Sequence, residues 1–375
     1  MKHLQTSACI FILMLLLMAS CMKNKDILAK RVPQLPATPY SYISDVVIPP
    51  GNPWGNGTVD NTPPNNQTTN AGATLGRVLF YERLFSLNNS ISCSSCHKQQ
   101  YAFSDNVDFS NGFDGGKTLR NALPVFNQQV NSAFFWDGRA ATLEGQSLMP
   151  VKNHIEMGME NLSNLAIKLK SVTYYPALFK NAFGSEDITA NKIADALAQF
   201  MRSMRSFNSK FDVGGSCGFS NFSDKEREGM QIFSQSRCNN CHGGQNLSGN
   251  FQSDWANTGL DVVSTDKGKG AITGFAEQNG VFRVPSLRNI GLTAPYMHDG
   301  RYKTLDEVID HYAGGIQPSP NLDFRLTNMG WGIDTSRTPV QLNLTATQKE
   351  SLKAFLLTLN DYQFTSDPKF SDPFK

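Results

Sequence analysis

Apolar residues recur at helical spacing in two parts of the chain, and each part predicts an amphipathic helix. In the first part the apolar face consists of Ile193, Leu197, Phe200, Met201 and Met204. In the second part it consists of Leu352, Phe355, Leu356 and Leu359. Segments that alternate between apolar and polar residues, as half-buried strands do, are few. The pattern therefore predicts a mainly α-helical protein.

Two polar tetrads fit capping boxes, in which the first side chain caps the backbone N–H groups at the start of a helix. They are Ser223–Glu226 and Thr347–Glu350. We therefore expect one helix to begin after Ser223 and another after Thr347, and the second of these carries the C-terminal apolar face.

The chain repeats itself once. Two similar segments, Gly76–Phe80 and Gly229–Phe233, each precede a Cys-x-x-Cys-His motif. Further along, Trp136–Arg139 and His298–Arg301 each begin nine residues after an asparagine. We interpret the repeat as two homologous, mainly helical domains, one of residues 71–214 and one of residues 215–375.

The first 21 residues have the pattern of an export signal. Their apolar run, Ile10–Met18, is too short to span a bilayer and has the size of a signal-peptide core. Small residues then precede Cys21, as in bacterial lipoprotein cleavage sites. We expect residues 1–21 to be a signal peptide, with a lipid anchor on Cys21 and a location in the periplasm or cell envelope. A plain secretory peptide and an uncleaved anchor are the alternatives, and residues 22–70 are predicted as a linker or tether.

The composition permits a large core and gives no sign of a nucleic-acid partner. Of the 375 residues, 40% are hydrophobic and 18% are charged, which excludes wholesale disorder. Lys and Arg number 34 and Asp and Glu number 32, so the formal net charge is +2. Because no basic excess is present to neutralise a phosphate backbone, we expect no nucleic-acid binding.

Two short motifs carry the strongest chemical signal. They are Cys93-Ser-Ser-Cys96-His97 and Cys238-Asn-Asn-Cys241-His242. The pattern is typical of covalent haem attachment, in which two thiols bond the haem and the histidine ligates its iron. Four thiolates could instead bind zinc, but the two histidines would then be coincidental. We predict two haem c groups, with His97 and His242 as the proximal ligands.

Two haems in one chain could simply carry electrons, whereas an enzyme requires one iron with an open or openable sixth position. The sequence between His97 and Trp136 contains neither His nor Met, so the first domain supplies no conventional distal ligand nearby. The next candidate is His154, for which an exposed loop residue is the alternative interpretation. We therefore expect an open first haem at which peroxide can bind.

Together these motifs resemble the bacterial dihaem cytochrome c peroxidase family, which includes the methylamine-utilisation dihaem enzyme. Besides the two haem motifs, the resemblance is carried by Phe135–Ala140, Glu156–Gly158 and Leu292–Gly300. It implies two tandem cytochrome c-like domains, each with one covalently bound haem c. It also implies reduction of hydrogen peroxide to water with electrons from a small redox protein of the cytochrome c or cupredoxin type.

The resemblance implies roles for single residues at the first haem. His97 is then the proximal ligand of the peroxidatic haem, and Glu156 is the carboxylate that moves a proton between the peroxide oxygens. Gln146 matches a distal glutamine that hydrogen-bonds the bound oxygen. Trp136 matches a tryptophan between the haems, on an electron route, and ordinary core burial is compatible with that role.

The second haem resembles the electron-transfer site of the family, with His242 as proximal ligand. The family usually has a methionine on the distal side, but the matching position here is Tyr312, as in the methylamine-utilisation enzyme. Tyrosinate favours ferric iron, whereas methionine raises the potential. Tyr312 is therefore the expected sixth ligand; Met297 is one alternative, and a different ligand or none is the other.

The resemblance also implies a calcium ion between the domains. Its ligands would come from Asn121, Thr293 and Pro295, and ligation by oxygen alone suits calcium. The loop Gly112–Thr118 lacks the histidine that many family members hold there in the oxidised state. We therefore expect an enzyme that needs no reductive activation. The oligomeric state is open, with a homodimer as one option.

The leading hypothesis is thus a cytochrome c peroxidase. An enzyme that oxidises residues of a partner protein is the alternative that Tyr312 suggests. A non-enzymatic dihaem electron carrier is a third hypothesis, but a carrier would need neither Glu156 nor an empty distal face. No role is predicted for Cys217.

Overall fold

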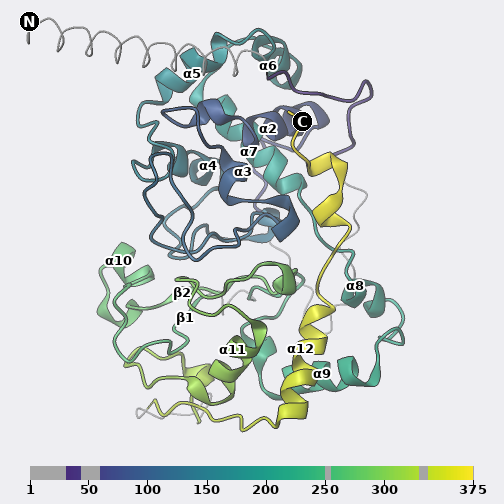
Figure 1. The fold of residues 1–375 in the computed structure, drawn as a ribbon, viewed down its shortest axis with the longest axis vertical. Helices are drawn as coiled ribbons and strands as arrows, with labels where there is room; N and C mark the ends of the chain where they lie inside the picture. Colours follow the sequence, from purple (N-terminus) through teal and green to yellow (C-terminus); the bar gives the residue numbers. More distant parts are fainter. Residues whose placement is uncertain (1–30, 44–59, 250–254, 329–336, 375) are drawn as a thin grey trace, which may run out of the picture.

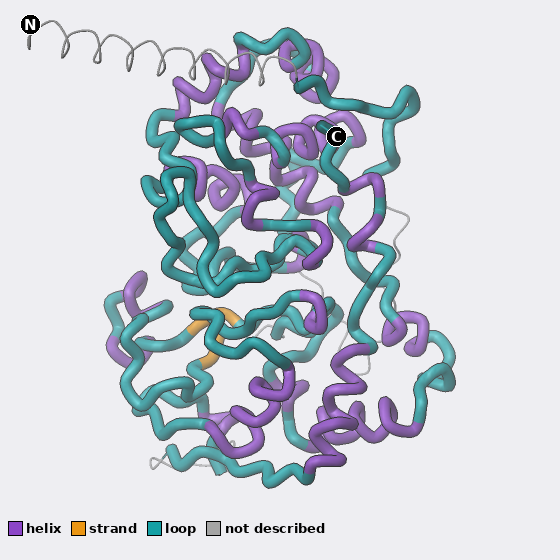
Figure 2. The backbone as a smooth tube through the Cα atoms, viewed as in Figure 1, coloured by secondary structure: helices purple, strands orange, loops and turns teal. Residues whose placement is uncertain are grey.

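The molecule is mainly α-helical, as predicted (Figures 1 and 2). The computed structural model describes residues 31–43, 60–249, 255–328 and 337–374. The α-helices are α2 (Asn70–Phe80), α3 (Cys93–Cys96), α4 (Leu143–Lys152), α5 (Leu162–Lys170), α6 (Tyr175–Phe183), α7 (Ala190–Ser203), α8 (Lys210–Gly215), α9 (Asp224–Gln235), α10 (Lys269–Thr273), α11 (Leu305–Asp310) and α12 (Ala346–Leu357). In the described part of the chain, the sheet structure is one antiparallel pair, β1 (Trp255–Ala256) with β2 (Phe282–Arg283).

The upper half of the molecule in Figure 1 is built around α2 and α7, which pack against each other. The side chains predicted to form the apolar face of α7 and the residue after it are all buried: Ile193, Leu197, Phe200, Met201 and Met204. Gly76 on α2 permits the close approach, because a Cβ there would lie 2.0 Å from the Ala196 carbonyl oxygen. This amphipathic helix is therefore confirmed.

The lower half repeats the arrangement with α9 and α12, which also pack against each other. The predicted apolar positions are buried here too: Leu352, Phe355, Leu356 and Leu359. Gly229 corresponds to Gly76, because a Cβ at Gly229 would lie 1.8 Å from the Ser351 carbonyl oxygen. Both halves of the repeat thus use a glycine to bring their two central helices into contact.

One predicted helix start is confirmed and the other is wrong. The capping box at Ser223 opens α9. α12, however, is capped by Thr345, whose Oγ1 accepts the Gln348 N–H at 3.2 Å, while Gln348 Oε1 accepts the Thr345 N–H at 2.9 Å. Thr347 lies inside the first turn. Two overlapping tetrads satisfy the sequence rule, and the rule alone does not choose between them.

The C-terminal segment returns to the upper half, where it appears in yellow in Figure 1. Phe364 and Phe370 belong to the upper hydrophobic core, and Tyr81 Oη donates to the Phe370 carbonyl at 2.7 Å. The lower half has a hydrophobic core of its own. The division into domains at 71–214 and 215–375 stays a prediction.

The predicted signal peptide, residues 1–21, lies outside the described residues, as does the lipidation site Cys21. Of the predicted linker, residues 22–70, parts are described, and they pack against the upper half. Tyr42 is buried there, and its Oη donates to the Lys369 carbonyl at 3.0 Å. Within the described residues, no helix is long and apolar enough to cross a membrane.

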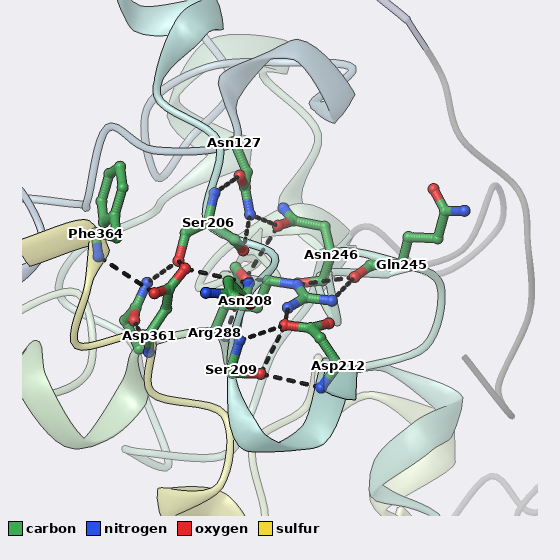
Figure 3. Close-up of polar contacts among 12 residues, drawn as sticks. Asn127, Ser206, Asn208, Ser209, Asp212, Gln245, Asn246, Arg288, Asp361 and Phe364 are labelled. Carbon is green, nitrogen blue, oxygen red and sulfur yellow. Dashed lines mark hydrogen bonds and ion pairs between the residues drawn. The ribbon is translucent and has the colours of Figure 1, made fainter. Parts of the chain in front are cut away.

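In the described part of the chain, two segments connect the halves, and repeat-related asparagines hold them. Asn127, in the upper half, donates its backbone N–H to the Met204 carbonyl at 2.8 Å. Its Oδ1 accepts the Ser206 N–H at 2.8 Å, as Figure 3 shows. These bonds fix the segment that leads from α7 to α8. Asn127 adopts a left-handed backbone conformation, with φ of 52°.

Asn289 makes the corresponding contacts in the lower half, with φ of 58°. Its N–H donates to the Leu359 carbonyl at 2.9 Å, and its Oδ1 accepts the Asp361 N–H at 2.8 Å. The two segments meet where Ser206 Oγ donates to Asp361 Oδ2 at 3.1 Å (Figure 3). The repeat is therefore also present in the way the two halves are joined.

Candidate functional site

The first Cys-x-x-Cys-His motif forms a single helical turn. α3 begins after Ser92, where a capping box with Ser95 fixes its start. The His97 N–H donates to the Cys93 carbonyl at 2.9 Å, so the histidine ends the turn that carries both thiols. His97 Nδ1 lies 3.0 Å from the Phe103 carbonyl oxygen. With Nδ1–H donating there, Nε2 is left to ligate a metal.

The second motif repeats this arrangement. Cys238–Asn240 form a 3-10 turn, and the His242 N–H donates to the Cys238 carbonyl at 2.8 Å. His242 Nδ1 lies 3.1 Å from the Leu247 carbonyl oxygen. Leu247 and its counterpart Phe103 are fully buried and left-handed, with φ of 52° and 59°. In both sites an unusual backbone conformation thus presents the carbonyl that orients the histidine.

The thiols of both motifs are unpaired, and burial suppresses their ionisation. Burial raises the pKa of Cys93 and of Cys238 to about 12, and that of Cys96 and of Cys241 to about 11. Burial also lowers the pKa of His242 to about 4 and lowers that of His97. Two thiols outside any disulfide, beside an imidazole oriented by a backbone carbonyl, fit a covalently attached haem at each motif.

A cavity of about 370 Å³ adjoins the second motif. His242 lines it together with the thiols Cys238 and Cys241. Both candidate sixth ligands, Tyr312 and Met297, also line this cavity. Its size and largely apolar walls suit a flat, mostly apolar group such as haem.

Tyr312 projects from a π-helical turn, His311–Gly315, directly after α11. Such turns recur at functional sites because the extra residue changes the direction of a side chain. His311 Nε2 lies 3.0 Å from the Thr258 carbonyl oxygen, so this histidine has a backbone partner and is not a free ligand. Burial raises the pKa of Tyr312 well above its usual value, and the nearby thiols add to the effect.

Trp136 extends from the upper half to the wall of the same cavity. Its Nε1 donates to the Asn121 carbonyl at 2.9 Å. The Trp136 ring meets His298 edge-on at 6.5 Å between centroids, and His298 stacks on Phe282 at 3.9 Å. Trp136 therefore lies at the interface between the halves, half-buried among aromatic rings.

The interface itself follows the internal repeat. The Asn121 N–H donates to the His298 carbonyl at 2.8 Å, and the Arg283 N–H donates to the Trp136 carbonyl at 2.8 Å. Trp136 and His298 occupy equivalent positions in the repeat, so each half contributes the same loop to the contact. The sequence indicated the repeated loops but not that they face each other.

Sequence reasoning missed an ion-pair cluster beside Trp136. Arg120 bridges the halves, with Nε and Nη2 on Asp266 at 2.6 and 2.8 Å and Nη1 on Asp137 at 2.6 Å. Burial opposes ionisation of Asp266, but the hydrogen bonds from Arg120 outweigh it and lower the pKa of that carboxyl. Arg120 also lies 5.5 Å over the Phe282 ring.

Glu156 is half-buried in the turn that follows α4. Its N–H donates to Asn153 Oδ1 at 3.2 Å. Burial raises the pKa of the Glu156 carboxyl, and the positive charge of Arg139 opposes that rise only in part. The Glu156 charge in turn raises the pKa of Cys93 and of Cys96, so the carboxyl lies within electrostatic reach of the first motif.

Three further residues from the sequence analysis are Gln146, His154 and Cys217. Gln146 is half-buried on α4, and in the described part of the chain no hydrogen bond joins it to Glu156. His154 is exposed, as is Cys217. No cluster of three or more His, Cys, Asp or Glu side chains suited to a metal occurs in the described ranges.

The three residues predicted to bind calcium share one region. Asn121, Thr293 and Pro295 all line the cavity between the halves. Asn121 Nδ2 donates to the carbonyls of Val107 and Asp108 at 3.1 and 3.4 Å, which turns Oδ1 away from them. The calcium site itself stays a prediction.

Three comparisons place the chain among known proteins. A family model described as di-haem cytochrome c peroxidase matches residues 70–214. The methylamine utilization protein MauG of Methylorubrum extorquens is 34% identical over 267 residues, which cover 70% of this chain and 74% of that protein. Cytochrome c551 peroxidase of Nitrosomonas europaea is 35% identical over 240 residues, covering 64% and 71%. The crystal structure of a MauG-like protein associated with microbial copper homeostasis is 34% identical and has a TM-score of 0.74, over 84% of this chain and 97% of that one.

Proposed function

The chain belongs to the di-haem cytochrome c peroxidase family, and from this premise we propose that it reduces hydrogen peroxide to water with electrons from a small redox protein. Two electrons and two protons convert one peroxide molecule into two waters. Membership in the family implies two haem c groups. The repeated helix pairs and repeated motifs support two tandem cytochrome c-like domains with one haem each.

The residues present fit these groups. Cys93 and Cys96 would hold the first haem covalently, with Nε2 of His97 on its iron, and the second motif would hold the other haem in the same way. When bound, the haems supply iron that changes oxidation state and delivers electrons to the O–O bond. The protein supplies the orientation of each histidine, through the carbonyls of Phe103 and Leu247.

At the first site, Glu156 would act as the general base and then as the general acid. The observation that carries the proposal is a half-buried carboxyl with a raised pKa, close to the first motif. An ionised Glu156 can accept a proton from one peroxide oxygen, and its raised pKa favours the return of that proton to the departing oxygen. Gln146, on the preceding helix, would donate a hydrogen bond to the bound peroxide.

Electrons would enter at the second haem and cross by way of Trp136. The position of this ring, on the wall of the cavity at the second motif and against His298, supports that route. At the second haem, Tyr312 would be the sixth ligand, with Met297 as the alternative, since both line the cavity.

A calcium ion held by Asn121, with Thr293 and Pro295, would stabilise the interface.

The setting of the enzyme follows from the sequence. We propose export to the periplasm or cell envelope, with a lipid anchor at Cys21. The electron donor would be a small redox protein of the cytochrome c or cupredoxin type.

Substitution of Glu156 tests the proposed reaction. Glu156→Gln keeps the shape of the side chain and removes its ability to take a proton, so peroxide turnover should fall by at least about 100-fold. The matched control is Glu160→Gln, an exposed carboxylate four residues on, which should retain full turnover. Both haems should stay bound in both variants. Full turnover in Glu156→Gln would overturn the assignment of Glu156.

A second candidate function is oxidation of residues in a partner protein. Tyr312 at the cavity wall and the similarity to a methylamine utilization protein favour it. A two-haem protein of this kind would consume peroxide and keep the oxidising equivalents, with little oxidation of a small cytochrome. The same turnover assay therefore separates the two functions.

A further inference from the structure

The loop Ser110–Thr118 forms a tight hairpin beside the Glu156 turn. The Thr118 N–H donates to the Ser110 carbonyl at 3.0 Å, and the Gly112 N–H donates to the Gly116 carbonyl at 2.7 Å. At the tip, the Gly116 N–H donates to Asp114 Oδ1 at 3.1 Å. The hairpin is therefore an ordered element with its own hydrogen bonds, although no helix or long strand contains it.

Three contacts join the tip of this hairpin to the turn that carries Glu156. The Phe113 N–H donates to the Glu156 carbonyl at 2.9 Å. The Phe113 ring covers Gly158 so closely that a Cβ there would lie 2.6 Å from two ring carbons. Gly112 approaches the turn as well, because its Cβ would lie 1.7 Å from the Ile155 carbonyl oxygen. Both glycines are thus required by the closeness of the two segments.

Phe113 is also held by two residues of the segment that precedes α3, the helical turn of the first motif. Its carbonyl accepts hydrogen bonds from Asn88 Nδ2 at 2.7 Å and from Ser90 Oγ at 3.3 Å. Asn88 and Ser90 immediately precede the turn that carries Cys93 and Cys96. Phe113 thus links the backbone of Glu156 to two side chains of the segment that leads into the first motif.

The Glu156 carboxyl has no such support of its own. Within the part of the chain that the structure describes, no hydrogen bond or ion pair holds this carboxyl, although the backbone on both sides of it is bonded. The direction of the side chain therefore depends on where its backbone lies. We propose that Phe113 is a positioning residue for Glu156: its ring packs on Gly158 and its N–H bonds the Glu156 carbonyl, and together these contacts fix the carboxyl near the first motif.

This inference rests on the proposed function, because it assumes that Glu156 transfers the peroxide proton. The hairpin would then position Glu156, although it supplies no histidine ligand to the iron. A displacement of about 1 Å of a reacting group can cost about 100-fold in rate, so partial loosening should be measurable.

A double-mutant cycle on the haem-loaded protein tests the inference. Phe113→Ala should lower kcat/KM for peroxide by about tenfold, mainly through kcat, and Phe113→Leu, which keeps most of the volume, should lose less than about threefold. In the Glu156→Gln background, Phe113→Ala should change the rate by less than about twofold, because the group it positions is already disabled. Leu119→Ala is the matched control, since that side chain in the next turn is 79% exposed.

Haem stoichiometry and the midpoint potentials of both haems are measured for every variant, and they should match the parent protein. Equal losses from Phe113→Ala in both backgrounds, or no loss in the parent background, would overturn the positioning role. If Glu156→Gln keeps full turnover, the proposed acid–base role fails as well. If Glu156→Gln loses most of its turnover but Phe113→Ala lowers the rate equally in both backgrounds, only the positioning role of Phe113 fails.

Discussion

The buried ion pair between Arg288 and Asp212 joins Arg288, the residue before Asn289, to α8. Nη1 of Arg288 lies 2.8 Å from Asp212 Oδ2, and the side chains are 2% and 4% exposed. Nε and Nη2 of Arg288 also donate to the Gln245 carbonyl, at 2.9 and 2.7 Å (Figure 3). Gln245 follows His242 by three residues, so the pair supports the second haem motif.

Arg288→Met removes the positive charge, and among the described residues it leaves the buried Asp212 with only the N–H and Oγ of Ser209 as donors. Loss of one partner of a buried pair costs about 3–5 kcal/mol, because the remaining charge is desolvated without compensation. We therefore expect the free energy of unfolding to fall by about 3–5 kcal/mol in equilibrium urea denaturation followed by circular dichroism. The stacking of Arg288 on Phe207, at 4.4 Å, is lost at the same time.

Two further variants separate charge from packing. The double substitution Asp212→Asn with Arg288→Met leaves no unpaired charge, so it should be less destabilising than Arg288→Met alone. Lys180→Met breaks an exposed pair whose side chains are 63% and 61% exposed, and it should leave stability unchanged. A loss below about 1 kcal/mol in Arg288→Met would refute the reasoning, as would a double variant that is less stable than the single one.

Two more predictions concern the sites. Because burial raises the pKa of Glu156 above its ordinary 4.5 and the proton acceptor must be ionised, kcat/KM for peroxide should fall as the pH drops through a midpoint above 4.5. A pH–rate profile checks this, and the Glu156→Gln variant should lack that limb. Tyr312→Met should raise the midpoint potential of the second haem in a spectroelectrochemical titration, whereas Met297→Leu should not. An unchanged potential in Tyr312→Met, together with a lowered potential in Met297→Leu, would instead make Met297 the ligand.

Local patterns predicted local structure well. The apolar face of α7, the capping box at Ser223 and the repeat of the helix pairs could all be inferred because each depends on neighbouring residues. The error at Thr347 is of the same local kind, since Thr345 offers an equivalent box two residues earlier. Glycines such as Gly76 and Gly229 matched in the sequence, but their shared role became clear only from the helix they contact.

Long-range contacts could not be inferred from spacing. Arg120 reaches Asp266 across the interface, and Asn127 and Asn289 hold two crossing segments, yet nothing in the sequence pairs these positions. The carbonyl of Phe103, which orients His97, depends on a left-handed backbone at a large apolar residue, which propensity alone disfavours. The cysteines and histidines of the haem motifs could be found because their chemistry needs adjacent residues.

The most direct test is peroxide-dependent oxidation of a reduced small cytochrome c by the fully oxidised, haem-loaded protein, without pre-reduction. We predict immediate, sustained turnover, because the Gly112–Thr118 loop supplies no histidine to the first iron. Consumption of peroxide with little oxidation of the cytochrome would contradict a peroxidase and favour oxidation of a partner protein. No reaction with peroxide would contradict an open first site altogether.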